Sequence, residues 1–140
     1  MNEKYIYISI SKLDDKDDHL QVIIDSVNKG GYKHLVGVIK NNDVLSIEEG
    51  DDLEELSLMS AHRLNEIKKS SFIIIDWHDE REGILIDCGA AWALNIPLII
   101  LCDGLSHLPP DAESLAKSVI YWSDYNELRE NLLREIKIEN

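Results

Sequence analysis

Basic side chains are few in this sequence of 140 residues: 14 lysines and arginines stand against 27 aspartates and glutamates, a formal net charge of -13. Proteins that bind DNA, RNA or anionic membranes use lysine and arginine to neutralise phosphate groups, so this charge balance argues against all three partners. A small ligand with a single phosphate group is compatible with it. We therefore expect neither a nucleic acid polymer nor a membrane as a partner.

Cysteine is also scarce. Cys88 and Cys102 are the two cysteines, and they form neither a CxxC pair nor another metal-binding spacing. The first residues, Met1 to Lys4, lack the basic segment and the apolar segment that open a secretory signal. We therefore expect two buried thiols in a cytoplasmic protein.

Glycine-rich phosphate loops are missing, since neither a P-loop nor a GxGxxG fingerprint occurs. The five histidines are scattered without the helical spacing of a zinc site. We therefore expect no dinucleotide cofactor and no metal ion. Internal repeats, low-complexity segments and Gly/Ser linkers are absent too, so residues 1–140 are expected to form a single domain.

The most apolar stretch runs from Gly83 to Cys102 and has about the length of a membrane-spanning helix. Asp87, Asn95 and Pro97 interrupt it and argue against a membrane span. The sequence Asn-Ile-Pro instead predicts a break between a helix that ends near Asn95 and a short strand that begins at Pro97.

Apolar runs rich in β-branched residues alternate with amphipathic segments along the chain. Strands that are continuously apolar are typical of a parallel sheet with helices on both faces. We predict an α/β fold, a three-layer sandwich with a mostly parallel five-stranded sheet of the Rossmann or flavodoxin-like kind. The expected strands are 5–11, 34–39, 72–76, 97–102 and 118–122, and the expected helices are 20–27, 51–69, 83–95 and 125–136.

Two further expectations concern packing. Pro109 and Pro110 lie in the segment 105–113, which is expected to be irregular because proline disrupts a helix interior. Trp92 and Trp122 are expected in the core.

Polar residues follow the predicted strands at the edge where open α/β sheets bind ligands. Ser9 and the segment 11–15 follow the first strand, and Asp76 opens the segment 76–82 after the third. Asp87 is expected near the same edge because the loop before its helix is short. A charged, unpaired carboxylate in a dry core costs several kcal/mol, so Asp87 must have a partner or face a cavity that uses it.

The segment that begins at Asp76 carries a recognisable pattern. An acid that ends a strand and a short polar loop are followed by G-x-x-x-D-x-G-x-A, a helix rich in small residues, and the strand NIPLII. This pattern resembles the nucleoside 2-deoxyribosyltransferase-like family, which includes deoxynucleoside monophosphate N-glycosidases. The residues in register are Gly83, Asp87, Gly89, Ala91 and Pro97, and residues 6–11 are similar to the family's first strand and ligand-contacting loop.

The resemblance implies cleavage or transfer at the N-glycosidic bond of a nucleoside or nucleotide, with Asp87 at the position of the family's nucleophilic glutamate. Cleavage of this bond develops positive charge on the sugar, which a carboxylate can stabilise or attack. Asp14, Asp76 and His78 are the candidates to give the leaving base a proton or a hydrogen bond. The resemblance also implies a homo-oligomer and no cofactor.

The remaining predicted residues would bind the substrate. Arg81 stands where the family's glycosidases have a serine that helps to bind the 5'-phosphate, and arginine suits phosphate well. Asp76 can also cap the loop that follows it, and Trp77 and His78 fit loop packing as well as base stacking. The substrate-binding set is Ser9, Ser11, Trp77, His78, Arg81, Gly83 and Arg63.

Three positions depart from the family pattern. Asp87 is one methylene shorter than glutamate, Ile10 replaces a glycine, and Arg63 replaces an aspartate that orients the sugar. Arg63 shares a helical stripe with Leu56 and Ile67, which predicts that it points inward and can pair with Asp87. Two alternatives stay open for Asp87: it faces a ligand, or it is a structural carboxylate at the start of its helix, paired with Arg63 or with a backbone N–H. The three departures also favour a further alternative, a protein of this fold that has lost catalysis and binds a nucleotide as a sensor.

A receiver-like signalling domain is a further alternative. Asp14 and Asp15 after the first strand, together with Asp76, would fit Mg²⁺ binding and phosphoryl acceptance. A receiver needs a lysine after its fifth strand, where this chain has residues 121–123, Tyr-Trp-Ser, and Cys102 replaces the usual serine or threonine. These departures place it behind the glycosidase and the sensor.

Overall fold

Five parallel strands form one sheet in the order β2-β1-β3-β4-β5. The computed structural model describes residues 3–10, 18–38, 53–77, 82–104 and 107–137. The strands are β1 (Tyr5–Ile10), β2 (Lys33–Val38), β3 (Ser70–Trp77), β4 (Leu98–Asp103) and β5 (Ser118–Trp122). The predicted α/β fold with a five-stranded parallel sheet of the flavodoxin-like kind is confirmed.

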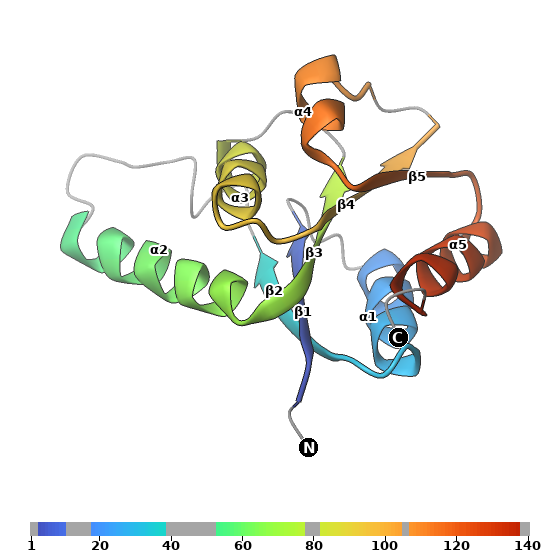
Figure 1. Cartoon of the computed structure of the whole chain (residues 1–140), viewed down its shortest axis with the longest axis horizontal. Helices are drawn as coiled ribbons and strands as arrows, with labels where there is room; N and C mark the ends of the chain where they lie inside the picture. Colours follow the sequence, from blue (N-terminus) through green and yellow to red (C-terminus); the bar gives the residue numbers. More distant parts are fainter. Residues whose placement is uncertain (1–2, 11–17, 39–52, 78–81, 105–106, 138–140) are drawn as a thin grey trace.

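Helices cover both faces of this sheet, as Figure 1 shows. The helices α1 (His19–Lys29) and α5 (Tyr125–Lys137) pack on one face. On the other face lie α2 (Leu53–Lys68), α3 (Glu82–Ala93) and the short α4 (Pro110–Leu115). Among the helices that the structure describes, none combines the length and the apolar character needed to cross a membrane.

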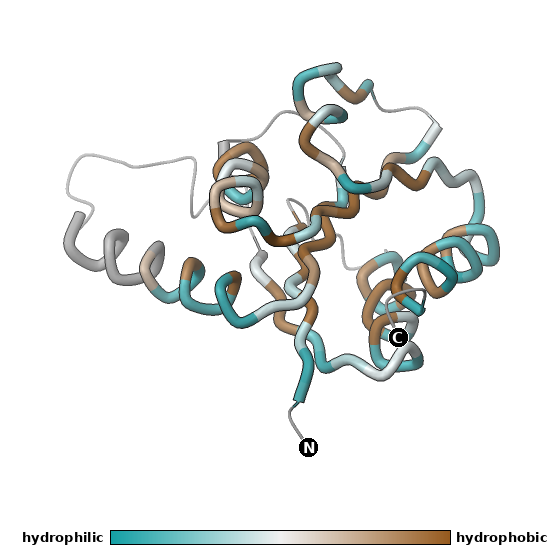
Figure 2. Tube along the Cα trace, viewed as in Figure 1, coloured by the Kyte–Doolittle hydropathy of each residue, from teal (hydrophilic) through white to brown (hydrophobic). Residues whose placement is uncertain are grey.

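Alternate residues of each strand enter two different cores, because successive side chains of a strand point to opposite faces. In β3, Phe72 and Ile74 belong to the core under α1 and α5, whereas Ile73 and Ile75 belong to the core under α2 and α3. The middle of β3 and most of β4 are therefore continuously hydrophobic (Figure 2). The same alternation sends Asp76 toward α1 and α5.

Helix α3 ends where the sequence predicted a break. Asn95 has a φ of 57°, in the left-handed region, and the Ile96 N–H donates to the Ala91 carbonyl at 2.9 Å. This 6→1 hydrogen bond after a left-handed residue is the Schellman arrangement that closes a helix. The apolar stretch from Gly83 to Cys102 thus forms most of the helix α3 and the buried strand β4.

Two expectations about packing were wrong. Pro110 begins α4, because proline fits the first turn of a helix, where its missing N–H has no intrahelical partner. Trp92 is 66% exposed instead of buried in the core. Trp122 is partly buried against the core under α1 and α5, and the thiols of Cys88 and Cys102 are buried as expected.

Candidate functional site

Asp87 lies in the second turn of α3 and faces β1 and α2 across a narrow interior space. The Ser9 hydroxyl, at the end of β1, donates to Asp87 Oδ2 at 2.6 Å. The Arg63 guanidinium, from α2, donates through Nη2 to Asp87 Oδ1 at 2.6 Å. The Asp87 side chain is 2% exposed and that of Arg63 is 25% exposed. The predicted pairing of Arg63 with Asp87 is confirmed, and both carboxylate oxygens have a donor.

The electrostatics of this pair combine burial with strong partners. Burial raises the pKa of Asp87, while the charge of Arg63 and the hydrogen bonds from Ser9 and Arg63 act in the opposite direction. Burial acts to lower the pKa of Arg63, but Asp87 raises it above its ordinary value. Because both Asp87 oxygens accept a hydrogen bond, the arrangement suits the ionised carboxylate. The site therefore holds an internal ion pair.

Tyr7 is a neighbour of this pair that the sequence did not reveal. Its side chain is fully buried on the same face of β1 as Ser9, and its phenol lies against Gly37 of β2. Burial, followed by the charge of Asp87, raises the pKa of Tyr7 to about 12, although Arg63 opposes the rise. A glycine inside a strand marks the close approach of another group, so Gly37 was the available signal.

Gly37→Ala should lower the free energy of unfolding by about 1–3 kcal/mol, the usual cost of overpacking a core. A Cβ at this position would overlap the Tyr7 hydroxyl and push the ring toward Arg63 and Asp87. Urea denaturation would measure the effect. Gly104→Ala is the matched control, because a Cβ there meets nothing within 4 Å. Equal stability of the two variants would contradict the tight packing of Tyr7 on Gly37.

The hollow that the described residues form beside the ion pair is small. A hollow of about 70 Å³ lies between α2 and α3 and is lined by Arg63, Leu64, Ile67, Ile86, Asp87 and Ala90. Ligand pockets commonly have about 300–1,000 Å³. This hollow, which the described residues line, is thus below the usual size of a ligand pocket.

Asp76 faces the side of the sheet opposite to Asp87, and its partner there is His19. His19 Nε2, in the first turn of α1, is 2.7 Å from Asp76 Oδ1, and both side chains are almost completely buried. The His19 ring is 4.8 Å from the ring of Trp122 and 6.0 Å from that of Tyr125. Asp76 and Asp87 thus end up on different faces, although Ile10 beside Ser9 pairs with Asp76 in the sheet.

The structure brings together three of the predicted site residues, namely Asp87, Ser9 and Arg63. Trp77 is fully buried, and its indole Nε1 donates to the His107 carbonyl at 3.0 Å. Gly83 lies in the first turn of α3. The predicted residues Ser11, Asp14, His78 and Arg81 lie outside the described residues. The catalytic and substrate-binding roles of all these residues stay predictions.

Two other features bear on a ligand or metal site. Within the described ranges, no group of three or more His, Cys, Asp or Glu side chains is arranged to hold a metal ion.

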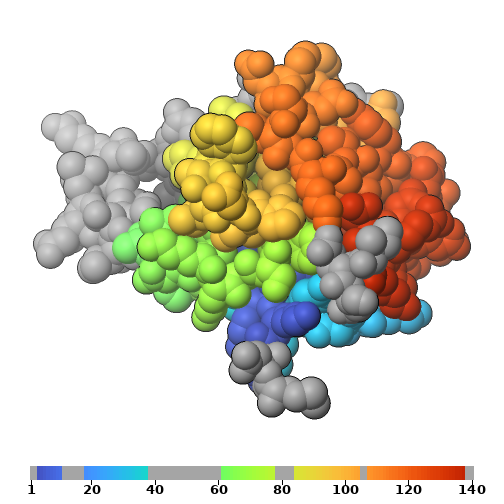
Figure 3. Space-filling model, in the orientation of Figure 1, coloured from blue at the N-terminus to red at the C-terminus, as the bar shows by residue number. Residues whose placement is uncertain are grey.

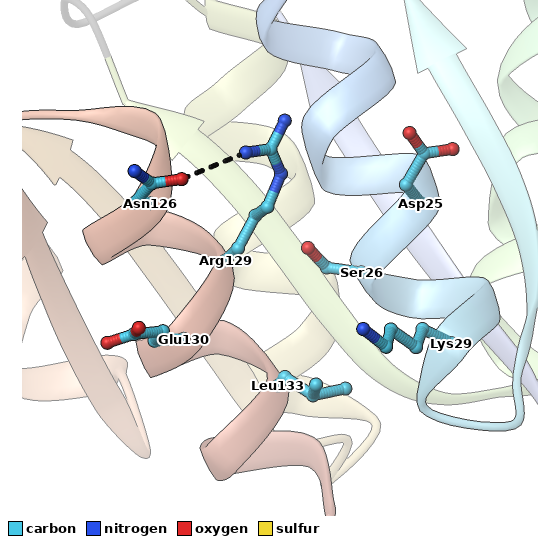
Figure 4. A pocket seen from close by; sticks show the side chains of 7 residues that line it. All are labelled: Asp25, Ser26, Lys29, Asn126, Arg129, Glu130 and Leu133. Carbon is cyan, nitrogen blue, oxygen red and sulfur yellow. Dashed lines mark hydrogen bonds between the residues drawn. The ribbon is translucent and has the colours of Figure 1, made fainter.

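A groove of about 370 Å³ lies between α1 and α5 (Figure 4), and its lining residues are Asp25, Ser26, Lys29, Asn126, Arg129, Glu130 and Leu133. Arg129 donates there to Asn126 at 3.2 Å. This groove is on the face of the sheet away from Asp87.

No protein-family model matches the sequence, and no curated protein matches it. Solved structures do share its fold. The CMP N-glycosidase BcmB from Clostridium botulinum has a TM-score of 0.65 and 12% identity, over 92% of this chain and 98% of that one. The 2-deoxyribosyltransferase from Bacillus psychrosaccharolyticus has a TM-score of 0.62 and 14% identity, over 90% and 95%. A conserved protein from Enterococcus faecalis has a TM-score of 0.61 and 13% identity, over 96% and 99%.

Identities of 12–14% show a shared fold and leave the activity open. A pilus assembly-related protein from Burkholderia pseudomallei has the same architecture at a TM-score of 0.55. One fold commonly carries unrelated functions, so function depends on the residues of the site. This chain has the fold of the N-glycosidase and the deoxyribosyltransferase.

Proposed function

We propose that this chain binds a nucleoside or nucleotide at the carboxyl edge of its sheet, between β1 and β3, without cleaving the N-glycosidic bond. The strand order supports the place, because β1 has β2 on one side and β3 on the other, and ligands bind where the order switches. The similarity to a CMP N-glycosidase and a 2-deoxyribosyltransferase supports the class of ligand.

The observation that carries the absence of cleavage is the Arg63–Asp87 ion pair. A carboxylate that attacks or stabilises the anomeric carbon must present an oxygen to the sugar at close range. Here Oδ1 accepts from Arg63 and Oδ2 accepts from Ser9, while the side chain is nearly inaccessible. Freeing Asp87 would deprive the largely buried Arg63 side chain of this partner, which costs several kcal/mol.

A second candidate, N-glycosidic cleavage or transfer by Asp87, is favoured by one specific observation. The Arg63 side chain is 25% exposed, so an anionic substrate could draw the guanidinium away from Asp87. Arginine binds phosphate through charge-assisted hydrogen bonds, and the exchange would release Oδ1 for the sugar. Ser9 would then keep the carboxylate oriented through Oδ2.

Nucleoside monophosphates should raise the melting temperature of the protein and release no free base. A ligand at about 100 times its Kd stabilises the folded state by about 2.7 kcal/mol. The experiment combines thermal unfolding with chromatography of the same samples. The ligands are the four nucleosides of RNA and the four of DNA, each tested as the nucleoside and as its 5'-monophosphate. A larger shift for monophosphates than for the matching nucleosides is expected if Arg81 holds the phosphate.

Asp87→Asn is the matched control because it keeps the shape of the side chain and removes its charge. Base release by the wild type that disappears in Asp87→Asn would overturn the binding-only proposal and establish the second candidate. Unchanged melting temperatures with every nucleoside and nucleotide would overturn both.

A further inference from the structure

The groove between α1 and α5 is a feature of the surface that nucleotide binding at the carboxyl edge of the sheet does not use. The two helices lie side by side on the face of the sheet away from Asp87, and atoms of both lie at the molecular surface (Figure 3). The groove has a volume of about 370 Å³. Sites for small molecules commonly have about 300–1,000 Å³, so this groove has room for a small organic ligand.

Two basic side chains from opposite walls point into the groove. Lys29, in the last turn of α1, extends toward α5, and Arg129 extends from α5 toward α1 (Figure 4). Ser26, which is 5% exposed, lies between them. Both basic side chains are exposed, so two positive charges face one space that a ligand can enter from solvent.

Neither cation has an ion pair among the residues that the structure describes. Lys29 lies four residues after Asp25, a spacing at which helices commonly form salt bridges. Asp25 instead accepts from the Gln21 amide at 2.8 Å, and Lys29 turns toward α5. Arg129 donates through Nη1 to Asn126 Oδ1 at 3.2 Å, which uses one of its five N–H donors. In a chain with 27 acidic and 14 basic residues, this arrangement indicates an anion from outside the chain.

We propose that the groove between α1 and α5 binds a small organic dianion, with Arg129 and Lys29 holding its negative charges. Both side chains form charge-assisted hydrogen bonds with phosphate and carboxylate groups. Leu133 also lines the groove and is partly buried against the core, so it offers an apolar surface to the carbon part of the ligand. A phosphate monoester and a dicarboxylate both have this chemistry.

The acidic residues of the groove limit the charge of the ligand. Asp25 and Glu130 belong to the lining, and their carboxylates turn away from the space between Lys29 and Arg129 (Figure 4). They would repel negative charge that extends beyond this space, and the net charge of -13 adds to the repulsion. The groove therefore suits a small dianion and disfavours a polyphosphate or a nucleic acid.

Isothermal titration calorimetry of the full chain tests the proposal, with glycerol 3-phosphate as the phosphate monoester and succinate as the dicarboxylate. At least one of the two is expected to bind. Lys29→Gln and Arg129→Gln should each weaken this binding by about 10- to 100-fold, the effect of losing a hydrogen bond to a charged group. Both side chains are exposed, so the melting temperatures of the variants without ligand should stay close to that of the wild type.

Two controls make the result specific. Arg134→Gln removes a charge of α5 outside the groove and should leave the affinity unchanged. Acetate, which carries one negative charge, should bind more weakly than the dianion that binds, at the same ionic strength. The position of the ligand is checked by nuclear magnetic resonance: backbone amide signals of residues 25–29 and 126–133 are expected to shift during the titration.

This proposal does not rest on nucleotide binding, because no residue of the groove belongs to β1 or β3. The rise in melting temperature with nucleoside monophosphates should be the same in Lys29→Gln, Arg129→Gln and the wild type, so either proposal can fail alone. Binding of glycerol 3-phosphate alone would identify the ligand class as phosphate monoesters, and binding of succinate alone would identify dicarboxylates. Failure of both dianions to bind, equal affinities of the wild type and the two groove variants, or acetate that binds as tightly as the dianion would overturn the proposal.

Discussion

Asp87→Ala should lower the free energy of unfolding by about 3–5 kcal/mol, the usual cost of removing one member of a buried ion pair. The loss arises because the Arg63 side chain, which is 25% exposed, would lose the oxygen that accepts its hydrogen bond at 2.6 Å. The Ser9 hydroxyl, which is fully buried, would lose its acceptor as well. Urea denaturation followed by circular dichroism measures the change, with an unchanged m-value as evidence that both states keep their compactness.

A double variant separates the lost pairing from the cavity that alanine creates. Arg63→Met combined with Asp87→Leu removes both charges and keeps most of the apolar volume. Such replacements of buried ion pairs are often neutral or stabilising, so the double variant should recover most of the stability. If Asp87→Ala alone costs less than about 1 kcal/mol, Arg63 reaches water easily. The binding-only proposal then loses its main support.

The inward direction of Arg63 could be predicted from the sequence because it depends on local periodicity, and the resemblance to the family suggested Asp87 as its partner. Arg63 lies four residues before Ile67, which is 2% exposed, so both point from α2 toward the sheet. The strands could also be predicted from the sequence, because a parallel sheet that is covered on both faces makes its strands mainly apolar. The strand expected at 72–76 extends over Ser70–Trp77 in the structure, and this difference is confined to its ends.

The contacts of Ser9 and His19 could not be predicted in this way. Ser9 is 78 residues from Asp87 in the sequence, and His19 is 57 residues from Asp76. Such pairs depend on which helix covers which face of the sheet, and no local pattern encodes that. A partial signal existed for His19, which continues the buried stripe of Ile23 and Val27 on α1.

The prediction that Trp92 lies in the core was wrong for a different physical reason. Helix α3 is apolar on nearly all sides, so its sequence has no polar face to indicate which residues point outward. The core takes Ile84, Cys88 and Ala91, and this leaves Trp92 in water in the single chain. The hydrophobic pattern of a helix identifies its core face only when the opposite face is polar.

Asp76→Ala should lower the free energy of unfolding by about 3 kcal/mol, since it removes the carboxylate that pairs with the buried His19 imidazole. The neighbouring rings of Trp122 and Tyr125 hold His19 in place, so the imidazole cannot move easily to water. Thermal or urea unfolding gives the magnitude. Tryptophan fluorescence provides a second signal, because the His19 ring lies 4.8 Å from Trp122 and a shift of the imidazole alters the surroundings of the indole.

The same variant distinguishes a structural Asp76 from the catalytic or substrate-contacting residue that the sequence predicts. If Asp76 serves the fold through His19, nucleoside monophosphates should raise the melting temperature of Asp76→Ala by as much as they raise that of the wild type, each measured against its own unliganded value. Asp76→Leu combined with His19→Leu should recover stability, because two apolar side chains then fill a space already bordered by Ile74 and Trp122. An Asp76→Ala variant that keeps its stability and loses only the nucleotide-dependent shift would contradict the structural role, since a carboxylate needed for packing cannot be removed without cost to the fold.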